Sequence, residues 1–379
     1  MVKKLENALK SRSSYIAKYI FNYINIETLL PTPISKMPAT LTRKLGKYGP
    51  EIPAIGFGLM GIGIDCYGAT GDDETRFAVL DHAWKQGCIH WDTSDAYGDS
   101  EELIGKWFKL HPERRADIFL ATKFGISAEA QPDGSYKGSV DSSPEYAKAA
   151  CEKSLKKLGV DYIDLYYAHR VDGKTPIEKT VQALAELKSE GKIKHLGFSE
   201  ISGESLRRAF AVHPIAAVQI EYNPWALETE GPVSKHLLEA CRELGVATIA
   251  YSPLGRGMLT GQVTSTAELD ERDFRNNVEQ FKGDNMKKNM QLVSKFKDVA
   301  AKKGCSPSQL ALAWLLAQGD DIFPIPGTKK IKYLDDNWGA QNVQLTADEA
   351  REIRQQVDQL GVAGGRDIAF NQYADTPAL

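Results

Sequence analysis

Four titratable residues from three neighbouring stretches of the chain have side chains suited to acid–base chemistry on a carbonyl group: Asp92, Tyr97, Lys123 and His169. A free tyrosine has a pKa of about 10, too high for an efficient acid at neutral pH. A lysine ammonium beside it would lower that pKa, and a carboxylate beside the lysine would keep the lysine charged in a dry pocket. A histidine could donate a hydrogen bond that orients the carbonyl. We therefore predict general acid catalysis with Tyr97 as the proton donor. The alternative is an ion pair of purely structural role, between Asp92 and Lys123, beside a capped histidine.

Reduction of a carbonyl also needs two electrons, which none of these side chains can supply, so hydride would come from a cofactor. Two glycine-containing loops could hold its phosphates, SPLGRG at 252–257 and PGTKK at 326–330. Glycine lets backbone N–H groups approach a phosphate, and a helix N-terminus with nearby lysines attracts an anion. Two such loops suit a dinucleotide with a further phosphate, which favours NADPH over NADH. Taken alone, they could also be ordinary glycine turns with solvated Lys329 and Lys330.

A series of apolar runs, separated by helical patterns, must position these residues. The predicted strands are 55–60, 88–93, 118–123, 163–169, 193–199, 217–222, 247–252 and 322–326. They are mostly apolar, as strands buried on both faces should be. The alternation predicts an α/β fold, a (β/α)₈ TIM barrel, opened by a short hairpin from TRKLG and EIPAI. Reactive groups in such barrels project from the C-terminal ends of strands, and phosphate sites usually follow the last two strands.

The glycines at 56, 58 and 61 spell GxGxxG, which resembles a dinucleotide-binding fingerprint. That motif must run directly from a strand into a helix. Here the next amphipathic helix begins only near Asp72 or Asp73, after a long loop. We therefore interpret Gly56–Gly61 as a segment that passes close to substrate and cofactor at the barrel mouth.

Composition limits the possible partners. Among 379 residues, 47 Lys and Arg face 50 Asp and Glu, so the net charge of −3 gives no general attraction to nucleic acid or anionic membranes. No apolar run approaches the roughly 18 residues of a membrane helix. Five cysteines without a CxxC pair favour reduced thiols over disulfides or zinc. We expect a small-molecule carbonyl substrate, no metal, and no nucleic-acid or membrane partner; protein partners are not indicated.

The first forty residues differ from the rest. Residues 1–36 carry six basic residues and two acids, and prolines at 31, 33 and 38 mark a linker. We predict a poorly ordered extension at 1–40, a barrel at 41–360 and a C-terminal tail at 361–379, in a cytoplasmic protein. The alternatives for the extension are a mitochondrial targeting peptide, which would be basic and amphipathic, and a partner-binding helix.

The runs WDTSDAYGDSEELIG (91–105), ATKFG (121–125), LYYAHR (165–170), LGFSE (196–200), QIEYN (219–223), AYSPLGRG (250–257) and IPGTKKIKYLDDN (325–337) together resemble the aldo-keto reductases. The resemblance covers about residues 41–350 and is closest to the fungal branch that includes pyridoxal reductases and broad aldehyde reductases. It implies that Tyr97 is the proton donor of a tetrad with Asp92, Lys123 and His169.

The same resemblance implies a cofactor site. Ser199 and Gln219 would hold the nicotinamide carboxamide, and Tyr251 would stack on the ring. The remaining cofactor residues that we expect are Gly58, Met60, Asp92, Ser252, Leu254, Gly255, Arg256, Gly257, Gly327, Thr328, Lys329, Asp336 and Asn337. Two positions depart from the family pattern: Glu200 replaces an asparagine after the carboxamide serine, and Tyr333 replaces an arginine that faces the 2′-phosphate in several members.

Aromatic and apolar residues near the predicted mouth suggest a pocket for an aromatic or apolar aldehyde or ketone. The substrate residues that we expect are Met60, Trp91, Tyr97, Phe124, His169 and Trp225. The long charged segment 254–285 suggests a lid over the cofactor. We predict an NADPH-dependent carbonyl reductase. The alternative is a regulatory subunit that keeps the barrel and binds cofactor as a redox sensor.

Overall fold

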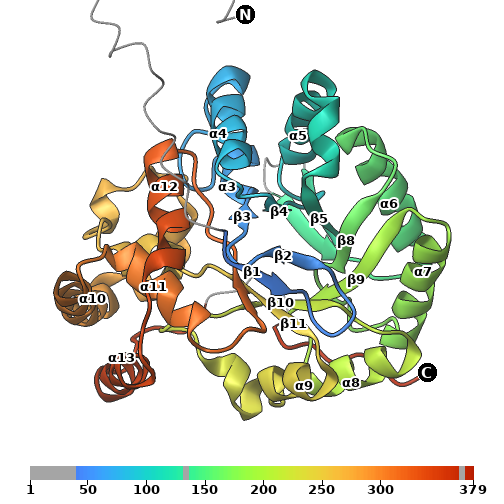
Figure 1. Cartoon of the computed structure of the whole chain (residues 1–379). Coiled ribbons are helices and arrows are strands. Elements are labelled where there is room, and N and C mark those ends of the chain that lie inside the picture. Colours follow the sequence, from blue (N-terminus) through green and yellow to red (C-terminus); the bar gives the residue numbers. More distant parts are fainter. Residues whose placement is uncertain (1–39, 131–135, 367–371) are drawn as a thin grey trace, which may run out of the picture. The chain divides into compact units, whose positions relative to one another are not determined.

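An eight-stranded parallel sheet forms the centre of the protein (Figure 1). The computed structural model describes residues 40–130, 136–366 and 372–379, so the predictions for residues 1–39 lie outside the described part. The strands are β3 Phe57–Gly58, β4 His90–Asp92, β5 Phe119–Phe124, β8 Ile163–Ala168, β9 Ile193–Ser199, β10 Ala217–Glu221, β11 Ala247–Tyr251 and β12 Ile322–Pro324. Each lies within or one residue beyond a predicted run, and they pair in chain order from β3 to β12.

Backbone hydrogen bonds join the two outer strands, β3 and β12, and so close the sheet. The Gly56 N–H donates to the Pro324 carbonyl at 2.9 Å, and the Gly58 N–H donates to the Pro326 carbonyl at 3.1 Å. A parallel bridge between Gly58 and Gly327 continues this contact. Closure leaves no free sheet edge, and the predicted (β/α)₈ barrel is confirmed.

Helices surround the ring of strands in Figure 1. They are α3 Met60–Gly63, α4 Asp73–Lys85, α5 Ser100–Leu110, α6 Pro144–Leu158, α7 Ile177–Ser189, α8 Gly203–Val212, α9 Leu237–Leu244, α10 Gly283–Lys303, α11 Pro307–Leu316, α12 Ile331–Gly339 and α13 Ala347–Leu360. Helix α6 begins at Pro144 because Ser143 caps its first turn, and it ends at Leu158 because Gly159, at φ +64°, adopts a left-handed conformation. Among the described residues, no helix is long and apolar enough to cross a membrane.

The predicted hairpin covers one end of the barrel interior. Strand β1 Thr42–Lys44 pairs antiparallel with β2 Glu51–Pro53. Leu45 and Ile52 pack in one cluster with interior side chains of five barrel strands, among them Phe119 of β5 and Phe323 of β12. Burying these apolar side chains closes the N-terminal end of the barrel and leaves only the C-terminal end for a site.

Side chains alternate between the barrel interior and the surrounding helices, as the two-residue period of a strand requires. In β5, Phe119 and Ala121 belong to the interior cluster, whereas Leu120 and Phe124 belong to the cluster packed against the helices. Lys123 shares the parity of Phe119 and therefore faces inward. The same rule selects the inward residues at the C-terminal ends of the other strands.

The chain beyond α13 returns to the body. The Ala374 N–H donates to the Glu200 carbonyl at 2.9 Å, just after β9, and Tyr373 is buried. The Arg208 side chain of α8 donates to the Thr376 carbonyl at 2.8 Å. These contacts attach the C-terminal residues to the C-terminal end of β9 and to α8.

Candidate active site

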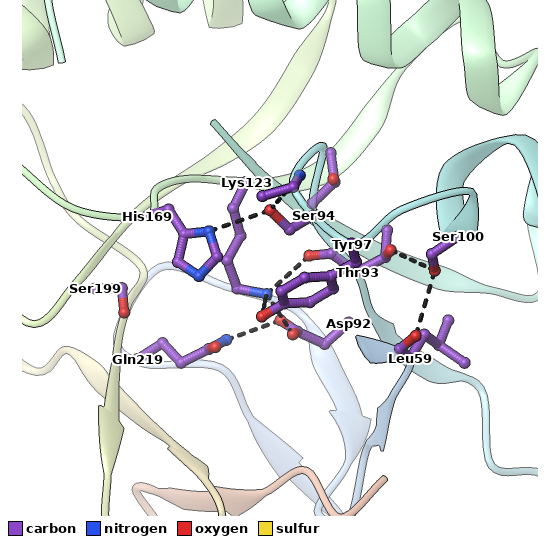
Figure 2. A network of polar contacts seen from close by, with 12 residues as sticks. Leu59, Asp92, Thr93, Ser94, Tyr97, Ser100, Lys123, His169, Ser199 and Gln219 are labelled. Atoms are coloured by element: carbon purple, nitrogen blue, oxygen red, sulfur yellow. Dashed lines mark hydrogen bonds and ion pairs between the residues drawn. The ribbon is translucent and has the colours of Figure 1, made fainter. Parts of the chain in front are cut away.

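Four of the predicted residues meet inside the C-terminal end of the barrel (Figure 2). Asp92 ends β4, Tyr97 lies in the loop after it, Lys123 lies in β5 and His169 directly follows β8. The Lys123 Nζ donates to Asp92 Oδ1 at 2.5 Å and to the Tyr97 hydroxyl at 3.5 Å. The Tyr97 and His169 rings meet edge to face with centroids 5.6 Å apart. The predicted tetrad is therefore assembled around the Tyr97 hydroxyl.

Lys123 is fully buried and remains charged because its partners offset the cost of burial. Burial alone would lower the pKa of Lys123, but the Asp92 carboxylate and Tyr97 oppose it, and the net shift is upward. A third hydrogen bond, to the Thr93 carbonyl at 2.7 Å, uses another of its protons. The Lys123 ammonium is therefore a fixed positive charge beside the Tyr97 hydroxyl.

Burial, rather than Lys123, has the largest effect on Tyr97. It raises the pKa of Tyr97, and the Lys123 ammonium acts in the opposite direction without cancelling the increase. Lys123 thus lowers the pKa of Tyr97 as expected, but the net shift of that pKa is upward. In the free protein Tyr97 is a protonated phenol at neutral pH, the form that can give up a proton.

His169 is a neutral imidazole in this site. Burial and the nearby charges of Lys123 and Arg170 hold the pKa of His169 well below its ordinary value. Its Nδ1 lies 3.1 Å from the Ser94 Oγ, and Figure 2 shows the other ring nitrogen on the side that faces Ser199 and Gln219. A neutral imidazole has one N–H to donate, so it could orient a carbonyl oxygen without transferring a proton to it.

The residues expected to hold the nicotinamide end neighbouring strands on the far side of the tetrad. Ser199 ends β9, Gln219 lies in β10 and Tyr251 ends β11. The Gln219 Nε2 donates to Asp92 Oδ2 at 2.8 Å, and the Ser199 Oγ accepts from Arg170 at 3.1 Å. Gln219 therefore connects this group directly to the tetrad.

The two predicted phosphate loops have backbones that suit an anion. In the loop after β11, Gly255 and Gly257 have φ values of +56° and +90°, and Arg256 stands between them at +54°. The Arg256 Nη1 is buried with no partner among the described residues. In the loop after β12, a Cβ on Gly327 would lie 2.8 Å from the Gly58 carbonyl oxygen, so the backbone there packs too closely for a side chain. Tight backbone turns and an unpaired guanidinium nitrogen fit a pyrophosphate.

Other predicted cofactor residues have partners of their own. Lys329 donates to the Tyr67 and Gly68 carbonyls at 2.9 and 2.6 Å, which joins the loop after β12 to the loop after β3. Asp336 accepts from Ser306 at 2.9 Å. Of the rest, Gly58 ends β3 and Met60 begins α3. Ser252 and Leu254 lie in the loop after β11, Thr328 lies in the loop after β12, and Asn337 lies in α12.

Two of the residues expected to line a substrate pocket point away from it. Trp91 packs against Trp107 of α5 with ring centroids 4.9 Å apart, and Phe124 stacks on Tyr166 at 5.0 Å. Both are fully buried in the cluster between strands and helices. Strand parity explains this, because each is adjacent to an inward tetrad residue and must face the opposite side. Of the others, Trp225 lies beside Gly255, and Met60 begins α3 at the barrel mouth.

A buried charge cluster lies beside Tyr251, and none of the sequence motifs predicts it. The Arg366 guanidinium donates to Glu200 at 2.7 Å, to Glu221 at 2.8 Å and to the Tyr251 hydroxyl at 3.2 Å. Arg256 donates to Glu221 at 3.0 Å from the other side. The departure at Glu200 was the only signal in the sequence, and it does not indicate that its partner lies 166 positions away.

Comparison with known proteins agrees with this geometry. The model of the aldo/keto reductase family matches residues 54–358. The chain is 49% identical over 343 residues to an aldo-keto reductase of the fungus Strobilurus tenacellus, covering 89% of this chain and 98% of that protein. It is 47% identical to an NADP(+) aldo-keto reductase of Schizosaccharomyces pombe, with the same shares covered.

Solved structures give the same result. A glycerol dehydrogenase from Gluconobacter oxydans superimposes with a TM-score of 0.76 at 27% identity, covering 88% of this chain and 99% of that one. A thermostable aldo-keto reductase, crystallised with the inhibitor epalrestat, gives 0.65 at 30% identity and covers 83% and 99%. The resemblance seen in the motifs is confirmed, and the chain is an oxidoreductase that belongs to the aldo/keto reductase family.

Proposed function

We propose that the protein reduces an aldehyde or ketone to an alcohol with NADPH, and that Tyr97 gives the proton. The observation that carries this proposal is the Tyr97 hydroxyl, 3.5 Å from the buried Lys123 ammonium and beside the neutral His169 ring. Bound NADPH supplies hydride to the carbonyl carbon. The name of the Schizosaccharomyces pombe relative, which includes NADP(+), supports this cofactor.

The residues of the site have separate tasks in this reaction. The His169 N–H would donate a hydrogen bond to the carbonyl oxygen and fix its direction. As negative charge develops on that oxygen, the Tyr97 hydroxyl would transfer its proton to it. Lys123 would stabilise the phenolate left behind, and Asp92, 2.5 Å away, would keep Lys123 charged.

On the cofactor side, the Ser199 hydroxyl and the Gln219 amide would bind the carboxamide, and the Tyr251 ring would cover one face of the nicotinamide. Gln219 and Lys123 both donate to Asp92, so a cofactor that binds Gln219 would also affect the hydrogen bonds of the tetrad. Arg256, Gly257 and Lys329 would bind phosphate groups through a guanidinium, a backbone N–H and an ammonium.

Replacing Tyr97 with phenylalanine tests the proton donor. Tyr97→Phe should reduce carbonyl turnover by about 10²-fold or more, since general acid catalysis contributes about that much. NADPH binding, followed by the quenching of tryptophan fluorescence, should stay near that of the unchanged protein. A variant that retained full turnover would exclude Tyr97 as the acid.

The substrate class can be tested with the unchanged protein. We propose an aromatic or apolar carbonyl compound, and pyridoxal belongs in the panel because of the resemblance to pyridoxal reductases. NADPH oxidation should be followed with pyridoxal, aromatic aldehydes, short aliphatic aldehydes and ketones. A protein that binds NADPH but oxidises it with none of them would instead be a redox-sensing subunit.

A further inference from the structure

The hydroxyl of Ser94 joins the catalytic histidine to a carboxyl group that the reaction above does not use. Its Oγ lies 3.1 Å from His169 Nδ1 and 3.2 Å from Asp95 Oδ1, and it accepts the Ala96 N–H at 3.2 Å. Ser94 is 1% exposed, so its hydroxyl is closed to bulk water. His169 and Asp95 thus meet through a single oxygen atom.

A hydroxyl has one proton and two lone pairs. The Ala96 N–H donates to one lone pair of the Ser94 hydroxyl. The second lone pair accepts a hydrogen bond from either Asp95 or His169, and the Ser94 hydroxyl donates its proton to whichever of these two residues is not the donor. If Asp95 is protonated, it donates to Ser94, and Ser94 donates to His169 Nδ1. If Asp95 is ionised, Ser94 donates to Asp95, and His169 must donate from Nδ1.

The two arrangements differ at the nitrogen that faces the site. His169 is neutral, so it carries one ring proton. When Nδ1 accepts from Ser94, that proton is on Nε2 and can be donated to a carbonyl oxygen. When Nδ1 donates to Ser94, Nε2 has only a lone pair, which repels a carbonyl oxygen.

The surroundings of Asp95 make both of its states accessible near neutral pH. Asp95 lines a cavity of about 430 Å³ between the start of α5 and helix α6, together with Glu101, Tyr146, Lys153 and Lys157. Burial and the Glu101 carboxylate raise the pKa of Asp95 to about 7, while the hydrogen bond with Ser94, the Lys157 ammonium and the Ala96 N–H act in the opposite direction. Lys157 is also held by Glu102 at 2.9 Å, which weakens its influence.

We propose that Ser94 and Asp95 are positioning residues: the protonation state of Asp95 sets the direction of the Ser94 hydroxyl and thereby decides which ring nitrogen of His169 carries the proton. Carbonyl reduction needs the arrangement with protonated Asp95. Alcohol oxidation passes through the same transition state, with the alcohol proton going to the Tyr97 phenolate, and therefore needs the same arrangement. The kinetic part of this proposal rests on the proposed role of His169 at the carbonyl, whereas the tautomer itself can be measured without turnover.

Nitrogen-15 NMR of the histidine side chains in the free protein tests the tautomer directly. The His169 resonances, identified by their loss in His169→Asn, should change from the Nε2–H to the Nδ1–H pattern between about pH 5.5 and about pH 8.5. Asp95→Asn removes the titrating carboxyl group, so the tautomer of His169 should no longer change with pH. A His169 tautomer that is constant with pH in the unchanged protein would overturn the proposal, whatever the enzyme reduces.

Kinetics then separate positioning from a merely structural role. The kcat for carbonyl reduction should fall about tenfold per pH unit above neutrality in the unchanged protein and stay level over the same range in Asp95→Asn. Ser94→Ala should also remove this pH dependence, because the connection is cut. Asp99→Asn changes an exposed carboxylate of the same loop that bonds to Arg76 and should keep the dependence. Equal pH profiles in all four proteins would contradict the proposal.

Discussion

At the scale of the residue, Lys123 connects most of the site. It is fully buried, and burying an ammonium ion without partners is costly. Its ammonium group donates hydrogen bonds to three oxygen atoms, one each of Asp92, Thr93 and Tyr97. The carboxylate of Asp92 thus has two effects: it keeps the ammonium charged, and it joins the ammonium to Gln219. The charge matters for the reaction because it opposes the rise that burial causes in the pKa of Tyr97.

Replacing Lys123 with methionine should therefore move the pH dependence in a defined direction. The pKa of Tyr97 is already raised by burial, and removing the ammonium raises it further. Alcohol oxidation, which needs the phenolate as a base, should then begin only at higher pH, and carbonyl reduction should slow by about 10²-fold or more because the phenolate is no longer stabilised. The pH profile of kcat in both directions measures this. Oxidation that begins at the same pH in Lys123→Met and in the unchanged protein would show that the ammonium does not act on Tyr97.

At the scale of the element, the sequence predicts the strands correctly, but two side chains were assigned to the wrong face of their strands. Each β strand lies within or one residue beyond a predicted run, because runs buried on both faces are apolar and glycine or proline bounds them. Trp91 and Phe124 were expected in the pocket because they are next to Asp92 and Lys123. That adjacency places them on the opposite face, so strand parity would have excluded both.

The segment after β11 contacts the loops that would surround the cofactor. The Phe274 N–H donates to the Cys66 carbonyl at 2.9 Å, and the Arg275 guanidinium lies 5.2 Å from the centre of the Tyr67 ring. Arg275 also donates to the Arg256 carbonyl at 3.4 Å and is paired with the buried Asp273. Arg275 thus links the proposed lid, the phosphate loop and the loop after β3.

Arg275→Ala should loosen this lid. With the guanidinium gone, the segment loses its contacts to Tyr67 and Arg256, and we expect NADPH to dissociate about tenfold faster, which corresponds to one charged hydrogen bond. Stopped-flow fluorescence of NADPH release measures this rate. Arg272→Ala, at an exposed position of the same segment, should leave the rate unchanged. Identical release rates in the two variants would show that the segment does not close over the cofactor.

At the scale of the whole molecule, the cluster that joins the end of the chain to the site could not be read from the sequence. Arg366 follows α13, yet its side chain is 3% exposed and lies between Glu200 after β9 and Glu221 at the end of β10. No motif spacing links these positions. Two carboxylates and two guanidiniums, the second from Arg256, balance one another there. Because β9, β10 and β11 are neighbours in the sheet, their C-terminal ends lie close enough for one arginine to contact all three.

Arg366→Met tests how strongly this cluster supports the fold. Among the described residues, Arg256 on Glu221 is the ion pair that remains, and breaking a buried ion pair from one side costs about 3–5 kcal/mol. We expect the free energy of unfolding in urea to fall by an amount of that order, and NADPH to bind more weakly because the Tyr251 hydroxyl loses a donor. Arg354→Met removes a half-exposed pair with Glu230 and should cost less than about 1 kcal/mol. If both variants lost the same small amount of stability, the cluster would contribute no more than a surface pair, and the C-terminal residues would be attached mainly by the buried Tyr373 and by the backbone contacts of Ala374.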